Sequence, residues 1–165
     1  MKATIRDLSS TQNIPHQRQV RLSTMLDLNT APYAALLLRV SLGVLFIAHG
    51  LLKVLVFTLP GTAQFFSNVG LPGLMAYPVT FLEVVGGIAL IAGFYTRWVA
   101  IALFPILVVA TFKVHWASGW LFTNENGGWE FPALFGIATV VQFLLGDGPY
   151  ALSTRLRQQP SVKNR

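Results

Sequence analysis

Three ionisable side chains in one apolar segment are the residues of this chain best suited to do chemistry. Arg39, His49 and Lys53 lie in the stretch LLLRVSLGVLFIAHGLLK, residues 36–53, which carries no acidic residue. Guanidinium, imidazole and ammonium groups can bind anions or hydrogen-bond a carbonyl oxygen, and histidine can also transfer a proton. With its flanks the segment is long enough to cross a bilayer, where such groups normally face a protein interior and a partner.

The nearest candidate partner is Glu83, the one charged residue of the second apolar segment. A helical rise of about 1.5 Å per residue separates Arg39 and Glu83 by roughly 10 Å along the membrane normal, within reach of two long side chains. We therefore predict that Arg39 and Glu83 pair, directly or through water, either as a structural ion pair or as part of a site. Gly43, Gly50 and Gly87 lie on the stripes of the two helices that are expected to meet, and Gly86 is a further glycine that would permit close helix packing.

A second set of polar residues is expected near the opposite end of the bundle. It comprises His49, Lys53, Lys113, His115 and Glu130, with Glu125 and Asn126 beside them. Histidine and lysine together could hydrogen-bond a quinone carbonyl or an anionic sulfur species. The alternatives are that the lysines only anchor the helices at the interface and that His49 only packs between helices. The histidine and carboxylate spacing is not diagnostic of metal ligation, so no metal site is predicted.

The composition is that of an integral membrane protein. Of the 165 residues 53% are hydrophobic and 11% are charged, whereas a soluble domain carries roughly a quarter charged residues. The net charge of +6 comes mainly from the two ends, without the basic helix or aromatic–basic face that nucleic-acid binding needs. The absence of cysteine excludes disulfides, thiolate nucleophiles and Cys-ligated metal clusters, so any electrons would be carried by a bound quinone, another cofactor or a partner.

The hydropathy pattern predicts an all-α fold, a four-helix transmembrane bundle with both termini cytoplasmic. A polar basic tail (1–30) precedes the membrane domain (31–150), and a second basic tail follows (151–165). The predicted spans are about 31–56, 74–94, 98–116 and 129–145. Lysine and arginine are concentrated in the two tails and at Arg97, against only Lys53 and Lys113 on the other side, and this asymmetry sets the orientation.

The same residues resemble a known family. The runs RVSLGVLFIAHGLLK, FFSNVGLPG, FLEVVGGIALIAGFYTR, NGGWEFP and LGDGPY are similar, in order, to the DoxX family of small four-span bacterial inner-membrane proteins. The resemblance covers about residues 36–152. The family often ends in a GxGxYSLD-like signature, which here reads GDGPYALST, so Ser153 replaces its acidic residue. The residues that align with the family's motifs are Arg39, His49, Lys53, Glu83, Gly87, Asn126, Gly127 and Glu130.

The resemblance implies an inner-membrane protein linked to oxidoreductase systems. The first hypothesis is an accessory or quinone- or small-molecule-binding subunit of a membrane oxidoreductase, in contact with the lipid bilayer and with other subunits of the complex. The alternatives are a small-solute carrier, for which no inverted repeat or broken helix pair is visible, and a non-catalytic assembly partner. The chain has no self-contained catalytic motif, and nothing in it indicates an oligomeric state or a nucleic-acid partner.

Overall fold

The part of the chain described by a computed structural model, residues 27–158, is helical and contains no strand, which confirms the all-α class. The predicted tails lie mostly outside this range, at 1–26 and 159–165. The α-helices are α2 (Ala31–Leu55), α3 (Leu59–Asn68), α4 (Ala76–Ala92), α5 (Thr96–Val109), α6 (Glu130–Leu145) and α7 (Leu152–Gln158). A 3₁₀ turn (Gly73–Met75) precedes α4, and a π-helical turn (Ala110–His115) and a 3₁₀ turn (Trp116–Ser118) extend α5.

Three helical stretches are long and apolar enough to cross a membrane. They are Ala31–Leu55, Gly73–Ala92 and Thr96–Ser118, of 25, 20 and 23 residues. Helix α6 is equally apolar but has only 16 residues, which corresponds to about 24 Å against a hydrocarbon thickness of about 30 Å. The number of crossings is therefore not decided by helix length alone.

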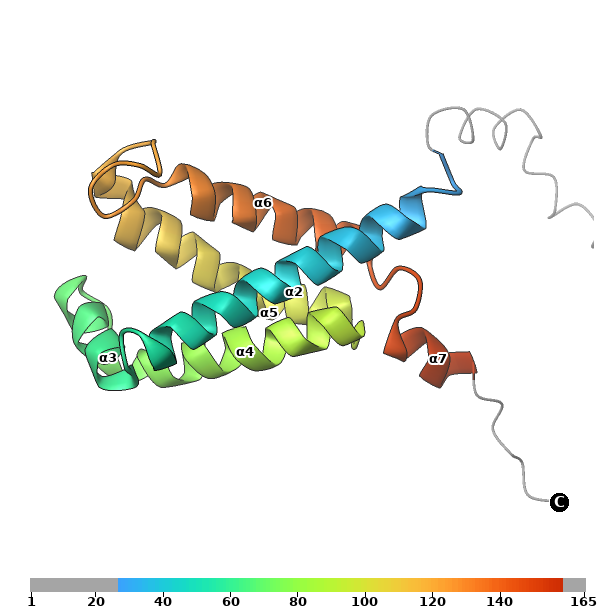
Figure 1. The fold of residues 1–165 in the computed structure, drawn as a ribbon, viewed down its shortest axis with the longest axis horizontal. Helices are drawn as coiled ribbons and strands as arrows, with labels where there is room; N and C mark the ends of the chain where they lie inside the picture. The colour runs from blue at the N-terminus through green and yellow to red at the C-terminus, as the bar shows by residue number, and fades with distance from the viewer. Residues whose placement is uncertain (1–26, 159–165) are drawn as a thin grey trace, which may run out of the picture.

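The helices run up and down as two antiparallel pairs (Figure 1). Helix α2 packs along α4, and α5 packs along α6. The start of α2 and the short helix α7 lie at one end of the bundle, called here the α7 end. Helix α3 and the loop between α5 and α6 lie at the other, the α3 end, toward which the two pairs diverge.

Glycine allows α2 and α4 to touch through their backbones. A Cβ atom built on Gly43 would lie 2.7 Å from the carbonyl oxygen of Gly87, and one on Gly87 would lie 2.7 Å from that of Gly43. Two turns further along α2, a Cβ on Gly50 would lie 2.6 Å from Val84. These three positions accept no larger residue unless the helices move apart. Gly86 faces the other way, toward Leu103 of α5.

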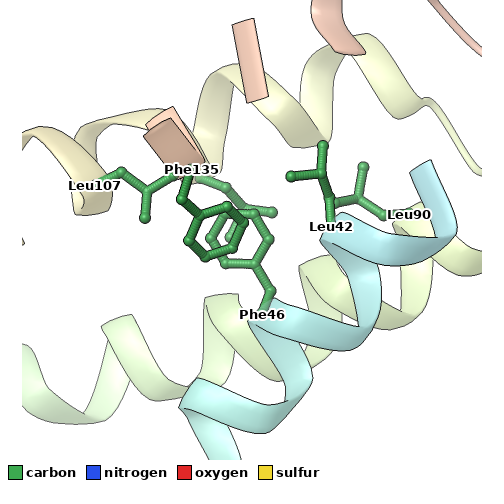
Figure 2. Packing of buried hydrophobic residues seen from close by; sticks show 6 residues of the cluster. Leu42, Phe46, Leu90, Leu107 and Phe135 are labelled. Carbon is green, nitrogen blue, oxygen red and sulfur yellow. The ribbon is translucent and has the colours of Figure 1, made fainter. Parts of the chain in front are cut away.

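An apolar core fills the middle of the bundle between the two pairs. It is formed by side chains from α2, α4, α5 and α6: Leu42, Phe46, Leu90, Leu103, Leu107 and Phe135. Figure 2 shows the rings of Phe46 and Phe135 packed against each other, with centroids 4.5 Å apart. Both rings are at most 5% exposed. No charged side chain belongs to this cluster, so it separates the polar residues of one end from those of the other.

The distribution of polarity is the reverse of that in a soluble protein. Arg39, Glu83 and Gln142 are at least 96% buried. Large apolar side chains cover the outside of the helices, among them Leu37, Leu55, Phe81, Ile137 and Leu144, each more than 60% exposed. An apolar surface of this extent is stable in lipid and not in water.

Replacement of Gly87 by alanine tests the packing of α2 on α4. Because its Cβ would meet the Gly43 carbonyl and the backbone of Ile47, we expect Gly87→Ala to lower the free energy of unfolding by about 1–3 kcal/mol. The measurement is unfolding in mild detergent titrated with dodecyl sulfate. Gly136→Ala is the control, since its Cβ would find its nearest neighbours at 3.7 Å. Equal effects at the two positions would contradict the assigned interface.

Candidate functional site

A buried ion pair joins α2 to α4 near the α3 end. The Lys53 ammonium lies 2.7 Å from Oε2 and 2.9 Å from Oε1 of Glu83, so both carboxylate oxygens accept from it. The side chains are 17% and 5% exposed, respectively. The ammonium also donates to the His49 carbonyl at 3.3 Å. An ion pair buried to this extent is stable only when both partners are present, because either charge alone would be left uncompensated.

The glycine interface places the two partners within reach. Gly50 lies one turn before Lys53 and sits against the Thr80 carbonyl and the Glu83 Cβ, at 3.3 Å from the position of its own missing Cβ. This close approach brings α4 near enough for the lysine side chain to extend along α2 to the carboxylate. The close packing of α2 on α4 at Gly50 therefore makes the ion pair between Lys53 and Glu83 possible.

His49 lies beside the ion pair with one ring nitrogen committed and the other unbonded. Its Nδ1 is 2.8 Å from the Leu45 carbonyl oxygen, and since a carbonyl can only accept, Nδ1 carries the hydrogen. Nε2 makes no hydrogen bond with any residue in the described part of the chain. The ring stacks on Phe131 of α6 and packs against Phe135, with centroids 5.9 Å apart in each case. Neutral His49 thus offers a free acceptor.

Thr80 adds a buried hydroxyl without a partner. It lies one turn before Glu83 on α4 and is 5% exposed, yet its Oγ1 finds no hydrogen-bond partner among residues 27–158. Buried hydroxyls are nearly always bonded to protein or to water. The group formed by His49, Lys53, Glu83 and Thr80, called here the Lys53 cluster, therefore has hydrogen-bonding capacity that the described protein groups do not satisfy.

Arg39 does not pair with Glu83, so that prediction is wrong. Arg39 lies in the first half of α2, nearer the α7 end. Its guanidinium donates to the Asp147 carbonyl at 2.8 Å and lies 3.5 Å from that of Pro149. These acceptors belong to the loop after α6, which lies at the α7 end of the bundle. The same loop also brings the negative charge of Asp147 near Arg39. Glu83 is instead reached by the basic side chain on its own side of the core, that of Lys53.

The loop after α6, residues 146–151, is called here the Arg39 loop. Two residues that were not among the predicted site residues, Asp147 and Ser153, hold it in place. Asp147 accepts the Thr96 backbone N–H at 3.1 Å and thereby caps the start of α5. The Ser153 hydroxyl lies 2.6 Å from the Asp147 carboxylate and 3.0 Å from the Gly93 carbonyl. Gly93 has a φ of +68°, and a side chain there would collide with the Arg39 guanidinium. The GDGPY motif predicts a turn after α6, but the sequence does not indicate which residues that turn contacts.

The remaining polar residues of the α3 end do not join the Lys53 cluster. Within the described range, no hydrogen bond or ion pair connects His49 or Lys53 to Lys113, His115 or Glu130. His115 bonds the carbonyls of Asn126 and Gly127 at 3.2 and 3.0 Å. Glu130 accepts the Phe122 N–H at 2.9 Å. Both order the α5–α6 loop, while Lys113 is exposed.

No metal centre can be built from the residues that the structure describes, since no three histidine, aspartate or glutamate side chains come together there.

A hollow of about 430 Å³ lies at the α3 end, beside the first turns of α6. Its lining consists of Trp120, Phe122, Glu130, Phe131 and Leu134. Phe131 is therefore shared between this hollow and the stack on His49. The hollow is referred to below as the α6 hollow.

Apolar helices that turn hydrophobic side chains outward and charges inward define a helical integral membrane protein with a polar interior. Comparison with known proteins is consistent with this class. The DoxX family model matches residues 34–116, and the chain belongs to the DoxX family, as its sequence motifs indicated. No solved structure matches the chain significantly.

Three relatives are similar over much of their length. A Bacillus subtilis (strain 168) protein named "Putative oxidoreductase CatD" is 34% identical over 71% of this chain and 82% of its own. An uncharacterised protein of Haemophilus influenzae (strain ATCC 51907 / DSM 11121 / KW20 / Rd) is 34% identical over 75% and 91%. The inner membrane protein YqjF of Escherichia coli (strain K12) is 36% identical over 51% and 65%. With its several apolar helices, the chain is a multi-pass inner-membrane protein.

A double-mutant cycle tests which charges interact. We expect Lys53→Met and Glu83→Leu each to lower the free energy of unfolding by about 3–5 kcal/mol, and the double variant to recover most of it, because no uncompensated charge remains. A second cycle that combines Arg39→Leu with Glu83→Leu serves as the comparison. Its interaction free energy should be at most about 0.5 kcal/mol, as for independent sites. A larger coupling in the second cycle than in the first would overturn the assignment.

Proposed function

We propose that the chain crosses the inner membrane four times with both termini in the cytoplasm. Helix α6 packs antiparallel along α5, so that the chain would return across the bilayer in α6. The outer face of α6 is apolar. A helix shorter than the bilayer is accommodated by local thinning at a modest free-energy cost. The excess of lysine and arginine in the two tails and at Arg97 supports an α7 end on the cytoplasmic side.

The orientation can be measured directly because the chain contains no cysteine. Single cysteines introduced at Thr154 and Asn124, both of which are exposed, would report the two ends through labelling by an impermeant maleimide. We expect labelling of Asn124→Cys in intact spheroplasts and of Thr154→Cys only after lysis. Labelling of both in intact spheroplasts would contradict a four-span topology.

We further propose that the protein is the membrane subunit of an oxidoreductase system and binds a quinone or another small molecule at the Lys53 cluster. The observation that carries this proposal is a buried Lys53–Glu83 pair beside a histidine with a free ring nitrogen. A purely structural ion pair would need neither the unbonded Nε2 of His49 nor the unpartnered hydroxyl of Thr80. The name given to the Bacillus subtilis relative supports the link to redox chemistry.

Each side chain of the cluster has a defined capacity. The ammonium of Lys53 can donate a hydrogen bond to a ligand carbonyl while Glu83 compensates its charge. The Nε2 atom of His49 can accept a hydrogen bond, or a proton, from a ligand hydroxyl. The Thr80 hydroxyl can either donate or accept. The group thus suits a ligand that alternates between carbonyl and hydroxyl, as a quinone does on reduction, with the electrons exchanged with a partner subunit.

The arrangement of the polar groups argues against a carrier function. The Lys53 cluster and the Arg39 loop lie on opposite sides of an apolar core that contains Phe46 and Phe135. A polar solute would have to lose part of its hydration shell to pass between these rings. The charges of the chain are therefore better explained by one binding site than by a path.

The proposal predicts that a quinone co-purifies with the wild-type protein in mild detergent and is detected by mass spectrometry of the extracted lipids. The double variant Lys53→Met/Glu83→Leu should fold, because both charges are removed together, but should carry at least about tenfold less quinone, the loss expected when about 1.4 kcal/mol of binding is removed. The double variant Lys113→Met/Glu125→Gln makes the matching charge changes at two exposed positions and should retain the ligand.

Two results would contradict the proposed function. The first is a wild-type protein that neither retains a quinone nor changes its melting temperature when a short-chain quinone is added. The second is full retention by the folded Lys53→Met/Glu83→Leu variant, which would show that the ion pair serves only the packing of α2 on α4.

A further inference from the structure

We infer that the ligand of the Lys53 cluster is a neutral aromatic amphiphile of the quinone type, and that it reaches His49 from the α6 hollow past the ring of Phe131. This inference rests on the proposed function, and it adds the class of ligand and the route. It commits to a ligand dissolved in the membrane rather than one from the aqueous phase.

The lining of the α6 hollow suits a planar apolar headgroup. Three of its five residues are aromatic, Trp120, Phe122 and Phe131, and Leu134 is aliphatic. The hollow has a volume of about 430 Å³ and is partly open to the outside of the bundle. Leu134 is 66% exposed on the outer surface of α6, which the bilayer contacts in a membrane-spanning helix. A lipid-dissolved molecule can therefore enter the hollow sideways without crossing water.

Phe131 borders both the α6 hollow and the His49 ring. Two rings pack against His49, those of Phe131 and Phe135. Phe135 is 5% exposed and fixed against Phe46 in the core, whereas Phe131 is 42% exposed. Only the Phe131 ring has free space on one side, and that space is the hollow. Rotation of this one side chain would uncover His49, and an aromatic headgroup could then take its place in the stack.

Charge argues against an anionic ligand on this route. The ammonium of Lys53 is already compensated by Glu83, so the pair offers an anion no net attraction. The α6 hollow contains a carboxylate, that of Glu130, and no basic residue. A sulfur oxyanion would be repelled at the entrance and would have to shed its hydration among phenyl rings. A neutral quinone has neither penalty.

Entry from the α7 end is blocked. The apolar core lies between that end and the Lys53 cluster. At the α7 end itself, the loop after α6 is fastened to α2 by Arg39 and to α5 through Asp147. The α3 end, where the two helix pairs diverge, is the one that offers a hollow bordered by a residue in contact with His49.

The test compares binding rates rather than affinity alone. A decyl-benzoquinone probe is mixed with the protein in lipid nanodiscs, and quenching of tryptophan fluorescence is followed by stopped flow. Because an access residue acts on both directions of the step, Phe131→Ala should accelerate both association and dissociation, and Phe131→Trp should slow both, by about tenfold with a smaller change in the dissociation constant. Phe112→Ala removes an exposed ring outside the hollow and is the matched control.

The outcomes separate this inference from the proposed function. If the wild-type protein binds the probe and the Phe131 variants bind it at unchanged rates, the route is wrong while the function stands. If thiosulfate displaces the probe competitively, the ligand class is wrong. If the wild-type protein does not bind the probe, the proposed function fails, and this inference fails with it. Altered rates in both Phe131 variants, with the Phe112 control unchanged, would support the assigned route.

Discussion

The pairing of Lys53 with Glu83 inside an apolar bundle is the interaction on which the rest of the structure depends. Neither charge is stable alone in this environment, so α2 and α4 must stay close enough to hold them at 2.7 Å. The glycines at 43, 50 and 87 make that distance possible by removing the side chains that would separate the helices. The packing of α2 on α4 and the ion pair between Lys53 and Glu83 therefore depend on each other, and a change in either disturbs both.

The two ends of the bundle use their charges differently. At the α7 end Arg39 binds backbone carbonyls of the loop after α6, and Asp147 with Ser153 ties that loop to α5 and α7. Three buried atoms at this end, Arg39 Nε, Thr96 Oγ1 and Gln142 Oε1, have no hydrogen-bond partner among the described residues. At the α3 end the Thr80 hydroxyl likewise has no partner among the described residues, and the one hydrogen bond of the His49 ring there is made by Nδ1. Unpartnered buried groups therefore occur at both ends, and the proposed site rests on their place beside a buried ion pair and a histidine.

Membership in the DoxX family identifies the class of protein but does not assign a role to any single residue. The geometry provides that assignment as a proposal: a charge-neutral pair, a histidine of defined tautomer and an aromatic hollow next to it. In that proposal, the apolar core between the two ends explains why these groups form one site and not a continuous path.

The sequence by itself determined the helical class, the membrane location and the burial of Arg39 and Glu83, because hydropathy and the cost of charge in lipid depend on composition and local spacing. It also indicated the glycines of the α2–α4 interface, since helical periodicity places them on one face. It did not determine which charges pair. Depth along a helix can be counted, but the acceptor of Arg39 lies 108 positions later in the chain, in a loop that folds back beneath the bundle. Only the tertiary structure brings that loop to Arg39, leaving Glu83 to Lys53.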